Sequence, residues 1–245
     1  MLHIPIALIT CLLLCCSCSI KNKEVIMENS YIYDLEGQRL SAIMYYLNNY
    51  DTKIRNLVPL VIINNGSDIK NYEYSYLAKE LANLGFYVIS LEHKVPNVKA
   101  SVPKYELYKM RKPLWSQGSR NILSVLENLK IQKKNIDFNN ITLIGHSHGG
   151  NIVMYFAQNY PELIKNAISL DNILMPIPRI HKPRILTIRS NDLIPMDGVL
   201  PTNADLKKFN IKVVKIPNAK HMDYCDRGNI EIKKITNQII IEFIK

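Results

Sequence analysis

The stretch NITLIGHSHGGNIVMYFAQNYP, residues 140–161, decides the fold expected for this chain. Its first part, Asn140–Ile144, is short, apolar and β-prone, which is typical of a buried strand. Its last part, Asn151–Tyr160, carries apolar residues at helical spacing and is closed by Pro161. Between them stands GHSHGG, residues 145–150. The sequence therefore predicts a strand, a sharp turn and a helix in immediate succession.

The serine at the centre of this turn is a candidate nucleophile. A G-x-S-x-G turn between a strand and a helix strains the serine backbone and holds its Oγ clear of the main chain. Gly145 and Gly149 allow the strand and the helix to approach where a Cβ atom would clash. We therefore expect Ser147 to attack a substrate, and the backbone N–H of His148 to face a developing oxyanion. His146 and His148 alternate along the chain, but no third ligand with zinc-type spacing accompanies them, so no metal site is predicted.

The rest of the chain alternates between strand-like and helix-like segments. The expected strands span 25–33, 40–47, 60–63, 86–91, 140–144, 167–170, 184–188 and 211–216. The expected helices span 72–84, 116–129, 151–160 and 230–244. Such alternation predicts an α/β fold, with a mostly parallel central sheet and helices on both faces. The connection 171–183 is too short for a cap domain, and 92–114, expected to be irregular, is the expected source of the substrate-binding walls.

A serine hydroxyl needs a base, and the base should be a histidine held in one tautomer by a carboxylate. This turn resembles that of the α/β hydrolases, and the resemblance implies that the acid and then the histidine follow the serine along the chain. His221 comes directly after the last predicted strand, which places it at the sheet edge where Ser147 lies. His181 stands between Arg179 and Lys182 in a short connection and is expected to face solvent. The predicted base is therefore His221.

Two aspartates are candidates for the acid. Asp192 follows the predicted strand 184–188, and Asp171 follows the predicted strand 167–170. Both positions lie at the sheet edge that carries Ser147. Asp192 is the preferred acid and Asp171 the alternative. The aspartate that is not the acid is expected to anchor its own loop by accepting backbone N–H bonds.

A second oxyanion donor is expected from the turn NNGS, residues 64–67, after the strand 60–63. Gly66 permits a close approach of the backbone, and the backbone N–H of Ser67 is the candidate donor. The same four residues are also compatible with a plain tight turn.

The composition excludes some classes of function. The chain has 245 residues, a net charge of +10 and 47% hydrophobic residues, enough for one α/β domain with a substantial core. Its basic residues are scattered, and the densest central cluster, Lys130, Lys133 and Lys134, has no interleaved aromatic residues. We therefore predict no nucleic-acid partner, while weak attraction to acidic lipid headgroups is compatible with this charge.

The first 18 residues are interpreted as an export signal, and residues 19–245 as one domain. Residues 4–18 are almost wholly apolar but short for a membrane span. Four cysteines lie within them, at positions 11, 15, 16 and 18. This resembles a bacterial lipoprotein signal, with Cys18 as the expected lipidated residue and Cys16 as the alternative; the other interpretation is an uncleaved anchor. The expected location is exported, either anchored to a membrane or free in the periplasm or outside the cell.

Several motifs together resemble the α/β-hydrolase superfamily, and within it the dienelactone hydrolases and platelet-activating factor acetylhydrolase-like esterases. They are Asn65-Gly66, Leu91-Glu92-His93-Lys94, Gly145–Gly150, Leu170-Asp171 with Met175-Pro176, and Asp192-Leu193-Ile194-Pro195. The acetylhydrolase-like pattern implies Asp171 as the acid, whereas the wider superfamily implies Asp192. The resemblance implies a serine hydrolase of short-chain or lipid acyl esters that works through an acyl-enzyme intermediate without metal or cofactor. The alternative is a catalytically silent binding or surface protein with the same fold.

Overall fold

The computed structural model describes residues 24–34, 36–48, 57–96, 102–133 and 135–245. The expected export signal, with Cys16 and Cys18, lies outside the described residues. Among the helices within these ranges, none has the length and apolar character needed to cross a lipid bilayer.

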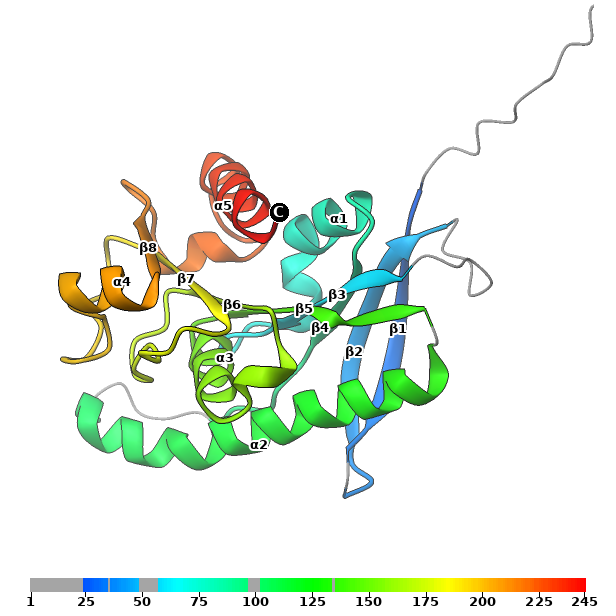
Figure 1. The fold of residues 1–245 in the computed structure, drawn as a ribbon, viewed down its shortest axis with the longest axis horizontal. Coiled ribbons are helices and arrows are strands. Elements are labelled where there is room, and N and C mark those ends of the chain that lie inside the picture. The colour runs from blue at the N-terminus through cyan, green and yellow to red at the C-terminus, as the bar shows by residue number, and fades with distance from the viewer. Residues whose placement is uncertain (1–23, 35, 49–56, 97–101, 134) are drawn as a thin grey trace, which may run out of the picture.

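Eight strands form one sheet in the described part of the chain, in the spatial order β1-β2-β4-β3-β5-β6-β7-β8 (Figure 1). The strands are β1 (Val25–Tyr33), β2 (Arg39–Leu47), β3 (Val58–Asn64), β4 (Tyr87–Leu91), β5 (Ile136–His146), β6 (Asn166–Leu170), β7 (Arg184–Arg189) and β8 (Lys212–Lys215). β1 pairs with β2, and β2 with β4, in antiparallel fashion, whereas all other neighbours are parallel. The carboxyl ends of β3 to β8 therefore meet at one edge of the sheet.

Helices cover both faces of this sheet. They are α1 (Ser75–Asn83), α2 (Lys104–Gln132), α3 (His148–Asn159), α4 (Asn203–Phe209) and α5 (Ile230–Ile244), with short 3₁₀ turns η1 (Asn71–Tyr74), η2 (Pro161–Leu163) and η3 (His221–Tyr224). Figure 1 shows α1 and α5 on one face and α2 and α3 on the other. The predicted α/β fold with a mostly parallel, doubly covered sheet is confirmed.

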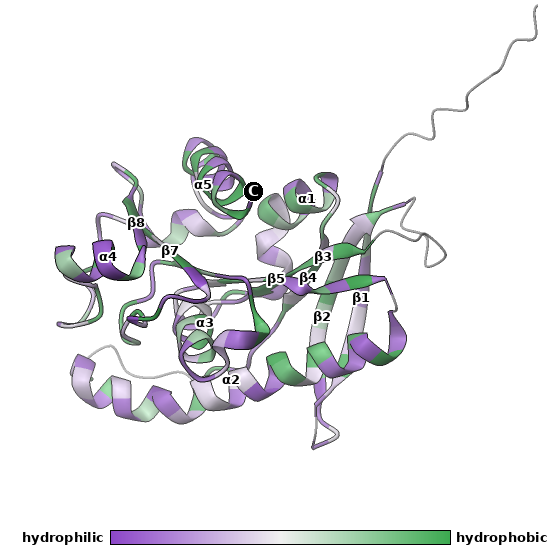
Figure 2. Ribbon diagram, in the orientation of Figure 1, coloured by the Kyte–Doolittle hydropathy of each residue, from purple (hydrophilic) through white to green (hydrophobic). Residues whose placement is uncertain are grey.

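The alternation of side chains along the buried strands explains the two covered faces. In β3, Leu60 and Ile62 pack in the core that contains α2 and α3, whereas Val61 and Ile63 pack in the core that contains α1 and α5. Successive residues of a strand point to opposite faces, so a continuous apolar run is buried on both sides. In Figure 2 the central strands are hydrophobic, while α2 and α5 mix hydrophilic and hydrophobic residues.

The segment 92–114 is less irregular than expected, because α2 already begins at Lys104. Pro113, which signals a helix end in sequence, lies within this helix. The position of Pro113 is exposed, so water can satisfy the carbonyl group that loses its N–H partner. The buried side chains of Arg111 and Trp115 fix the adjoining turns against the rest of the protein.

Other differences concern short elements. α4 was not expected, and it begins at a Thr202 cap whose side chain accepts from the N–H of Asp205 at 3.2 Å. The expected helix 72–84 is split into η1 and α1, and α3 starts three residues earlier than predicted, at His148. The connection 171–183 contains no helix or strand, as expected for a chain without a cap at this position.

Candidate active site

The backbone at Ser147 has the strained geometry that the turn between β5 and α3 requires. Ser147 has φ 53° and ψ −112°, an unfavourable region for a residue with a side chain. A Cβ atom at Gly145 would lie 2.2 Å from the carbonyl oxygen of Gly149, and one at Gly149 would lie 2.1 Å from that of Asn64. The two glycines are therefore needed for the close approach of β5, α3 and β3.

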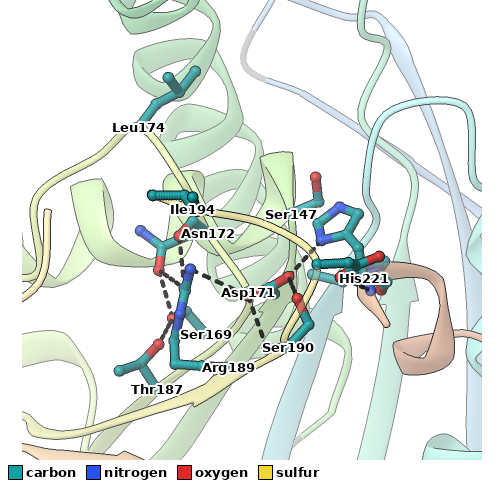
Figure 3. A network of polar contacts seen from close by, with 12 residues as sticks. Ser147, Ser169, Asp171, Asn172, Leu174, Thr187, Arg189, Ser190, Ile194 and His221 are labelled. Atoms are coloured by element: carbon teal, nitrogen blue, oxygen red, sulfur yellow. Dashed lines mark hydrogen bonds and ion pairs between the residues drawn. The ribbon is translucent and has the colours of Figure 1, made fainter. Parts of the chain in front are cut away.

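Ser147 is tied to the next strand of the sheet. Its backbone N–H donates to the carbonyl of Leu170, the last residue of β6, at 2.8 Å. Asp171 follows at once, so the register between β5 and β6 brings Ser147 and Asp171 to the same place on the edge. His221, from the loop after β8, reaches the same place through its bond to Asp171, and Figure 3 draws its imidazole next to the side chain of Ser147, whose hydroxyl points away from the ring in this view. The structure thus brings together the predicted nucleophile and base, although no hydrogen bond joins their side chains in this conformation.

The imidazole of His221 pairs with Asp171. Its Nδ1 lies 2.7 Å from Oδ2 of Asp171, whose side chain is fully buried. A carboxylate can only accept, so Nδ1 carries the hydrogen and Nε2 is free to take a proton. The preference for Asp192 as the residue that holds the imidazole is corrected by this geometry, and the alternative, Asp171, occupies that position.

Asp192 makes a different contact with the same residue. Its Oδ1 accepts a hydrogen bond of 2.8 Å from the backbone N–H of His221. This anchors the loop of His221, which is the role expected for the aspartate that is not the acid. Local spacing does not separate the two aspartates, because β6 and β7 are adjacent parallel strands and both loops leave at the same edge.

The carboxylate of Asp171 is held by two residues besides His221, through three contacts (Figure 3). Arg189 Nη2 lies 3.1 Å from Oδ1, the Ser190 N–H donates to Oδ1 at 3.1 Å, and the Ser190 hydroxyl donates to Oδ2 at 2.5 Å. Burial alone would raise the pKa of Asp171, but the bond from His221, the charge of Arg189 and the bonds from Ser190 together lower it. Asp171 is therefore a carboxylate that remains ionised despite its burial.

The turn after β3 supplies an unused backbone donor. The N–H of Gly66 already donates to the hydroxyl of Tyr74 at 2.8 Å. The N–H of Ser67 and that of His148, the first residue of α3, have no hydrogen-bond partner in the described structure. A Cβ atom at Gly66 would lie 3.3 Å from that of Ser147, so this turn passes directly by the serine. The two predicted oxyanion donors are therefore both available.

A buried network fixes this turn. Asn64 donates to the carbonyl of Ile144 at 3.0 Å and its Oδ1 lies 2.8 Å from Nε2 of His93. Asn65 accepts from the N–H of His93 at 2.7 Å and donates to the carbonyl of Ile69 at 2.8 Å. Burial lowers the pKa of His93 to about 4, so it is neutral near pH 7. The network holds the turn from both sides, and sequence reasoning did not identify His93 in this role.

Two further buried histidines flank Ser147. The pKa of His146 is lowered to about 3, by burial first and then by His221. The pKa of His148 is also lowered to about 3, by burial first and then by the charges of His93 and Arg111. His146 is hydrogen-bonded on both ring nitrogens, to Tyr74 and to the carbonyl of His221. Within the described ranges no group of at least three His, Cys, Asp or Glu side chains is placed to hold a metal ion.

Arg111, on α2, is a buried cation that forms no direct ion pair in the described structure, although the charge of Asp68 acts on it. Its side chain is 8% exposed and its Nη1 has no hydrogen-bond partner. Burial lowers the pKa of Arg111, and its charge contributes to the low pKa of His148. An unpaired positive charge close to the residue after Ser147 favours negative charge at this end of the site.

A cavity of about 450 Å³ lies further along the same edge of the sheet. Its lining residues come from the β1–β2 hairpin, the end of β4 and α2, and include Arg39, Glu92, His93, Lys94 and Leu114. The segment 92–114 contributes to the wall of this cavity together with the hairpin, while its expected role in substrate binding stays a prediction. Ser147 is not among the lining residues.

The remaining sequence candidates lie apart from this arrangement. His181 is exposed, as predicted, and its ring lies 5.1 Å from that of Phe209. Cys225 is a buried free thiol whose Sγ lies 3.3 Å from the carbonyl of Met222. Neither residue is joined to Ser147 or Asp171 by a hydrogen bond.

The comparisons with known proteins agree with the observed fold. Residues 58–187 match the family model described as the alpha/beta hydrolase fold. A protein assigned as a dienelactone hydrolase from Klebsiella pneumoniae subsp. pneumoniae is similar at 20% identity, with 90% of this chain and 98% of that chain covered and a TM-score of 0.67. A dienelactone hydrolase-like promiscuous phosphotriesterase from metagenomic libraries is similar at 13% identity, with 90% and 97% covered and a TM-score of 0.66.

Esterase 2 of Thermogutta terrifontis, in its form phosphorylated by paraoxon, is similar at 12% identity, with 89% of this chain and 93% of that chain covered and a TM-score of 0.66. No curated protein matches the sequence. At these identities the solved structures show a shared fold. The family match covers more than half of the chain and includes β3, the serine turn, β6 and most of β7. The chain belongs to the alpha/beta hydrolase fold family.

Proposed function

We propose that the protein is a serine hydrolase that cleaves carboxylic esters through an acyl-enzyme intermediate. One observation carries the proposal: Ser147 stands at φ 53° beside an imidazole whose Nδ1 is bound to a buried, ionised carboxylate. Strain of this kind persists where the surrounding structure enforces it, and such sites are commonly functional. Membership of the alpha/beta hydrolase fold family, together with esterases among its structural neighbours, supports hydrolase chemistry.

The proposed reaction begins with attack of Ser147 Oγ on the acyl carbon. His221 Nε2 takes the hydroxyl proton, and Asp171 stabilises the imidazolium that forms. The backbone N–H groups of His148 and Ser67 donate to the oxyanion, and such a donor contributes about 3 kcal/mol of transition-state stabilisation. His221 then protonates the leaving alcohol and later activates water, which hydrolyses the acyl-enzyme. The proposed reaction requires that Ser147 Oγ comes within hydrogen-bond distance of His221 Nε2 in the substrate complex, since catalytic hydrogen bonds often form only when substrate is bound.

Short-chain or lipid acyl esters are the proposed substrates. The connection 171–183 carries no helix or strand, which supports a site without a cap domain. Hydrolysis of a panel of p-nitrophenyl esters of increasing acyl length tests the substrate class. Preference for short chains identifies a small-ester hydrolase, and preference for long chains presented in vesicles identifies a lipid esterase.

A fluorophosphonate probe tests the proposed nucleophile. The wild-type protein should be labelled and Ser147→Ala should not, while His181→Ala, an exposed histidine, should be labelled like wild type. Absence of labelling on folded wild-type protein would contradict the proposal and favour a catalytically silent binding protein with this fold.

Export and lipid attachment at Cys18 remain part of the proposal and concern residues outside the described ranges. Metabolic labelling with an alkyne fatty acid in bacteria should modify wild type and Cys16→Ser but not Cys18→Ser. The opposite pattern assigns the lipid to Cys16, and equal labelling of all three rejects both residues.

A further inference from the structure

A chain of hydrogen bonds links the oxyanion turn to the backbone of His221. The N–H of Gly66 donates to the hydroxyl of Tyr74 at 2.8 Å. That hydroxyl lies 3.1 Å from Nδ1 of His146, and Nε2 of His146 lies 3.0 Å from the backbone carbonyl of His221. These contacts connect residues from the loop after β3, from η1, from the end of β5 and from η3.

The direction of each bond follows from its two ends. The carbonyl of His221 can only accept, so Nε2 of His146 carries the hydrogen. Nδ1 of the same neutral ring is then the acceptor, and the hydroxyl of Tyr74 donates to it. The oxygen of Tyr74 accepts from Gly66, whose N–H can only donate. Every member has one definite role, and reversal of a single bond would leave a buried group unsatisfied.

Burial keeps this chain in one protonation state. Tyr74 and His146 are both fully buried. Burial raises the pKa of Tyr74 and, together with the neighbouring His221, lowers the pKa of His146 to about 3. The ring of His146 also packs against that of His221, with 4.7 Å between the centroids. The chain is thus neutral, dry and in direct contact with the proposed base.

Both ends of the chain are part of the proposed catalytic machinery. Gly66 directly precedes Ser67, a proposed oxyanion donor, and His221 is the proposed base. Because Tyr74 accepts from the N–H of Gly66, that N–H cannot compete with Ser67 for the oxyanion. The same bond fixes the orientation of the peptide that follows Gly66. The carbonyl of His221 is held by His146 while its N–H is held by Asp192.

We propose that Tyr74 and His146 form a positioning relay, which sets the oxyanion turn and His221 at a fixed distance on either side of Ser147. The predicted effect on kinetics rests on the proposed ester hydrolysis. The coupling between Gly66 and His221 is itself a property of the folded protein. An apolar pair of similar volume would fill the same space but would not orient either backbone group.

Three variants and a control isolate the relay. Tyr74→Phe removes the donor to His146 and the acceptor of Gly66 with little change in volume. His146→Leu removes both ring nitrogens, whereas His146→Gln offers a carbonyl toward Tyr74 and an N–H toward His221. Tyr87→Phe is the matched control, because Tyr87 is also fully buried and its hydroxyl contacts Met44 Sδ at 3.0 Å, outside the relay.

Kinetics of ester hydrolysis give the first readout. Displacement of reacting groups by about 1 Å costs about 100-fold in rate, so Tyr74→Phe and His146→Leu should each lose about 10- to 100-fold in kcat with KM changed by less than about 3-fold. His146→Gln should recover most of the loss, and Tyr87→Phe should retain the wild-type kcat. Active-site titration with a fluorophosphonate corrects each kcat for the fraction of folded protein. Equal kcat values in all variants after this correction would overturn the relay.

Amide NMR gives a second readout that needs no turnover. Tyr74→Phe should speed hydrogen exchange at Gly66 and shift the amide resonances around His221, although Tyr74 does not contact the backbone of that residue. His146→Leu should shift Gly66 in return, and His146→Gln should reduce both effects. If wild type hydrolyses no ester, the proposed function fails while these shifts still support the coupling. Shifts confined to the neighbours of each substituted residue would overturn it.

Discussion

Asp192 holds the backbone of His221, while the side chain of His221 is held elsewhere. Oδ1 of Asp192 accepts from the N–H of His221 at 2.8 Å, and the imidazole Nδ1 meets Oδ2 of Asp171 at 2.7 Å. The carbonyl of His221 bonds to His146. The backbone N–H, the backbone carbonyl and the ring of this one residue are thus fixed by the loop after β7, the end of β5 and the loop after β6, which leaves Nε2 as the polar atom without a hydrogen bond in the described structure.

The two aspartates should respond differently to the same substitution. Asp171→Asn replaces the carboxylate that selects the imidazole tautomer, and we expect kcat to fall by about 10⁴-fold. Asp192→Asn keeps an oxygen that can accept from the backbone N–H, so kcat should fall by less than about 10-fold. Steady-state hydrolysis of a p-nitrophenyl ester measures both. A larger loss for Asp192→Asn would contradict the observed pairing.

Arg189 should stabilise the fold most where Asp171 is ionised. Arg189→Met leaves a buried carboxylate without its cation and should cost about 3–5 kcal/mol of unfolding free energy at pH 7. Because the pKa of Asp171 is lowered in the folded protein, the stability gained from Arg189 is present above the unfolded pKa and is lost as the pH falls through the folded pKa. The difference in unfolding free energy between wild type and Arg189→Met, measured by urea unfolding, should therefore shrink as the pH falls toward 3. A constant difference would contradict this account.

The three buried histidines should make the protein sensitive to acid. The pKa values of His93, His146 and His148 are lowered to about 4, 3 and 3. Their unfolded forms bind protons below about pH 6.5 while the folded forms do not, so each removes about 1.4 kcal/mol of stability per pH unit below that point. The stability is fully present above pH 6.5. His148→Gln should reduce the slope of unfolding free energy against pH, between about pH 6 and 4, by the contribution of one histidine, which is about 1.4 kcal/mol per pH unit. An unchanged slope would show that His148 does not contribute.

The strained backbone of Ser147 should lower the unfolding free energy of the protein. A glycine has no Cβ penalty at φ 53°, so Ser147→Gly should raise the unfolding free energy by about 1 kcal/mol. Ser147→Ala keeps the strain and is the control, and both variants should lack esterase activity. Thermal and urea unfolding of the three proteins measure the effect. A glycine variant less stable than the alanine variant would contradict the strain.

The buried charge of Arg111 should likewise lower the unfolding free energy while it supports activity. Removal of a buried charge that forms no direct ion pair should stabilise the protein, and we expect Arg111→Met to gain about 1 kcal/mol of unfolding free energy. The same change removes positive charge near the oxyanion donors and should lower kcat several-fold. Arg120→Met, on the exposed face of the same helix, should leave both quantities near wild type. A loss of stability in Arg111→Met would show that its stem packs more favourably than its charge costs.

The sequence by itself determined the elements that local chemistry specifies. The apolar run of β5, the two close-packing glycines and the helical spacing of α3 identified Ser147, because steric limits allow few residues in such a turn. The continuous apolar run in β3 identified a strand buried on both faces. The position of His221 after the last strand also followed from chain order, since parallel strands end at one edge. The expectation of an irregular segment over 92–114 was wrong in part, because α2 begins at Lys104 and continues through Pro113, whose position is exposed.

Only the tertiary structure decided which side chains meet. Asp171 and Asp192 leave neighbouring parallel strands at the same edge, so strand order does not distinguish them. Asp171 has φ 59°, its side chain is buried and it lies between His221 and Arg189, whereas Asp192 reaches the backbone of His221 instead. Tyr74, His146 and Arg189 likewise gain their roles from partners that are distant in sequence. Hydrogen bonds across loops depend on distances of a few tenths of an ångström, and such distances are set by packing of the whole sheet rather than by local sequence.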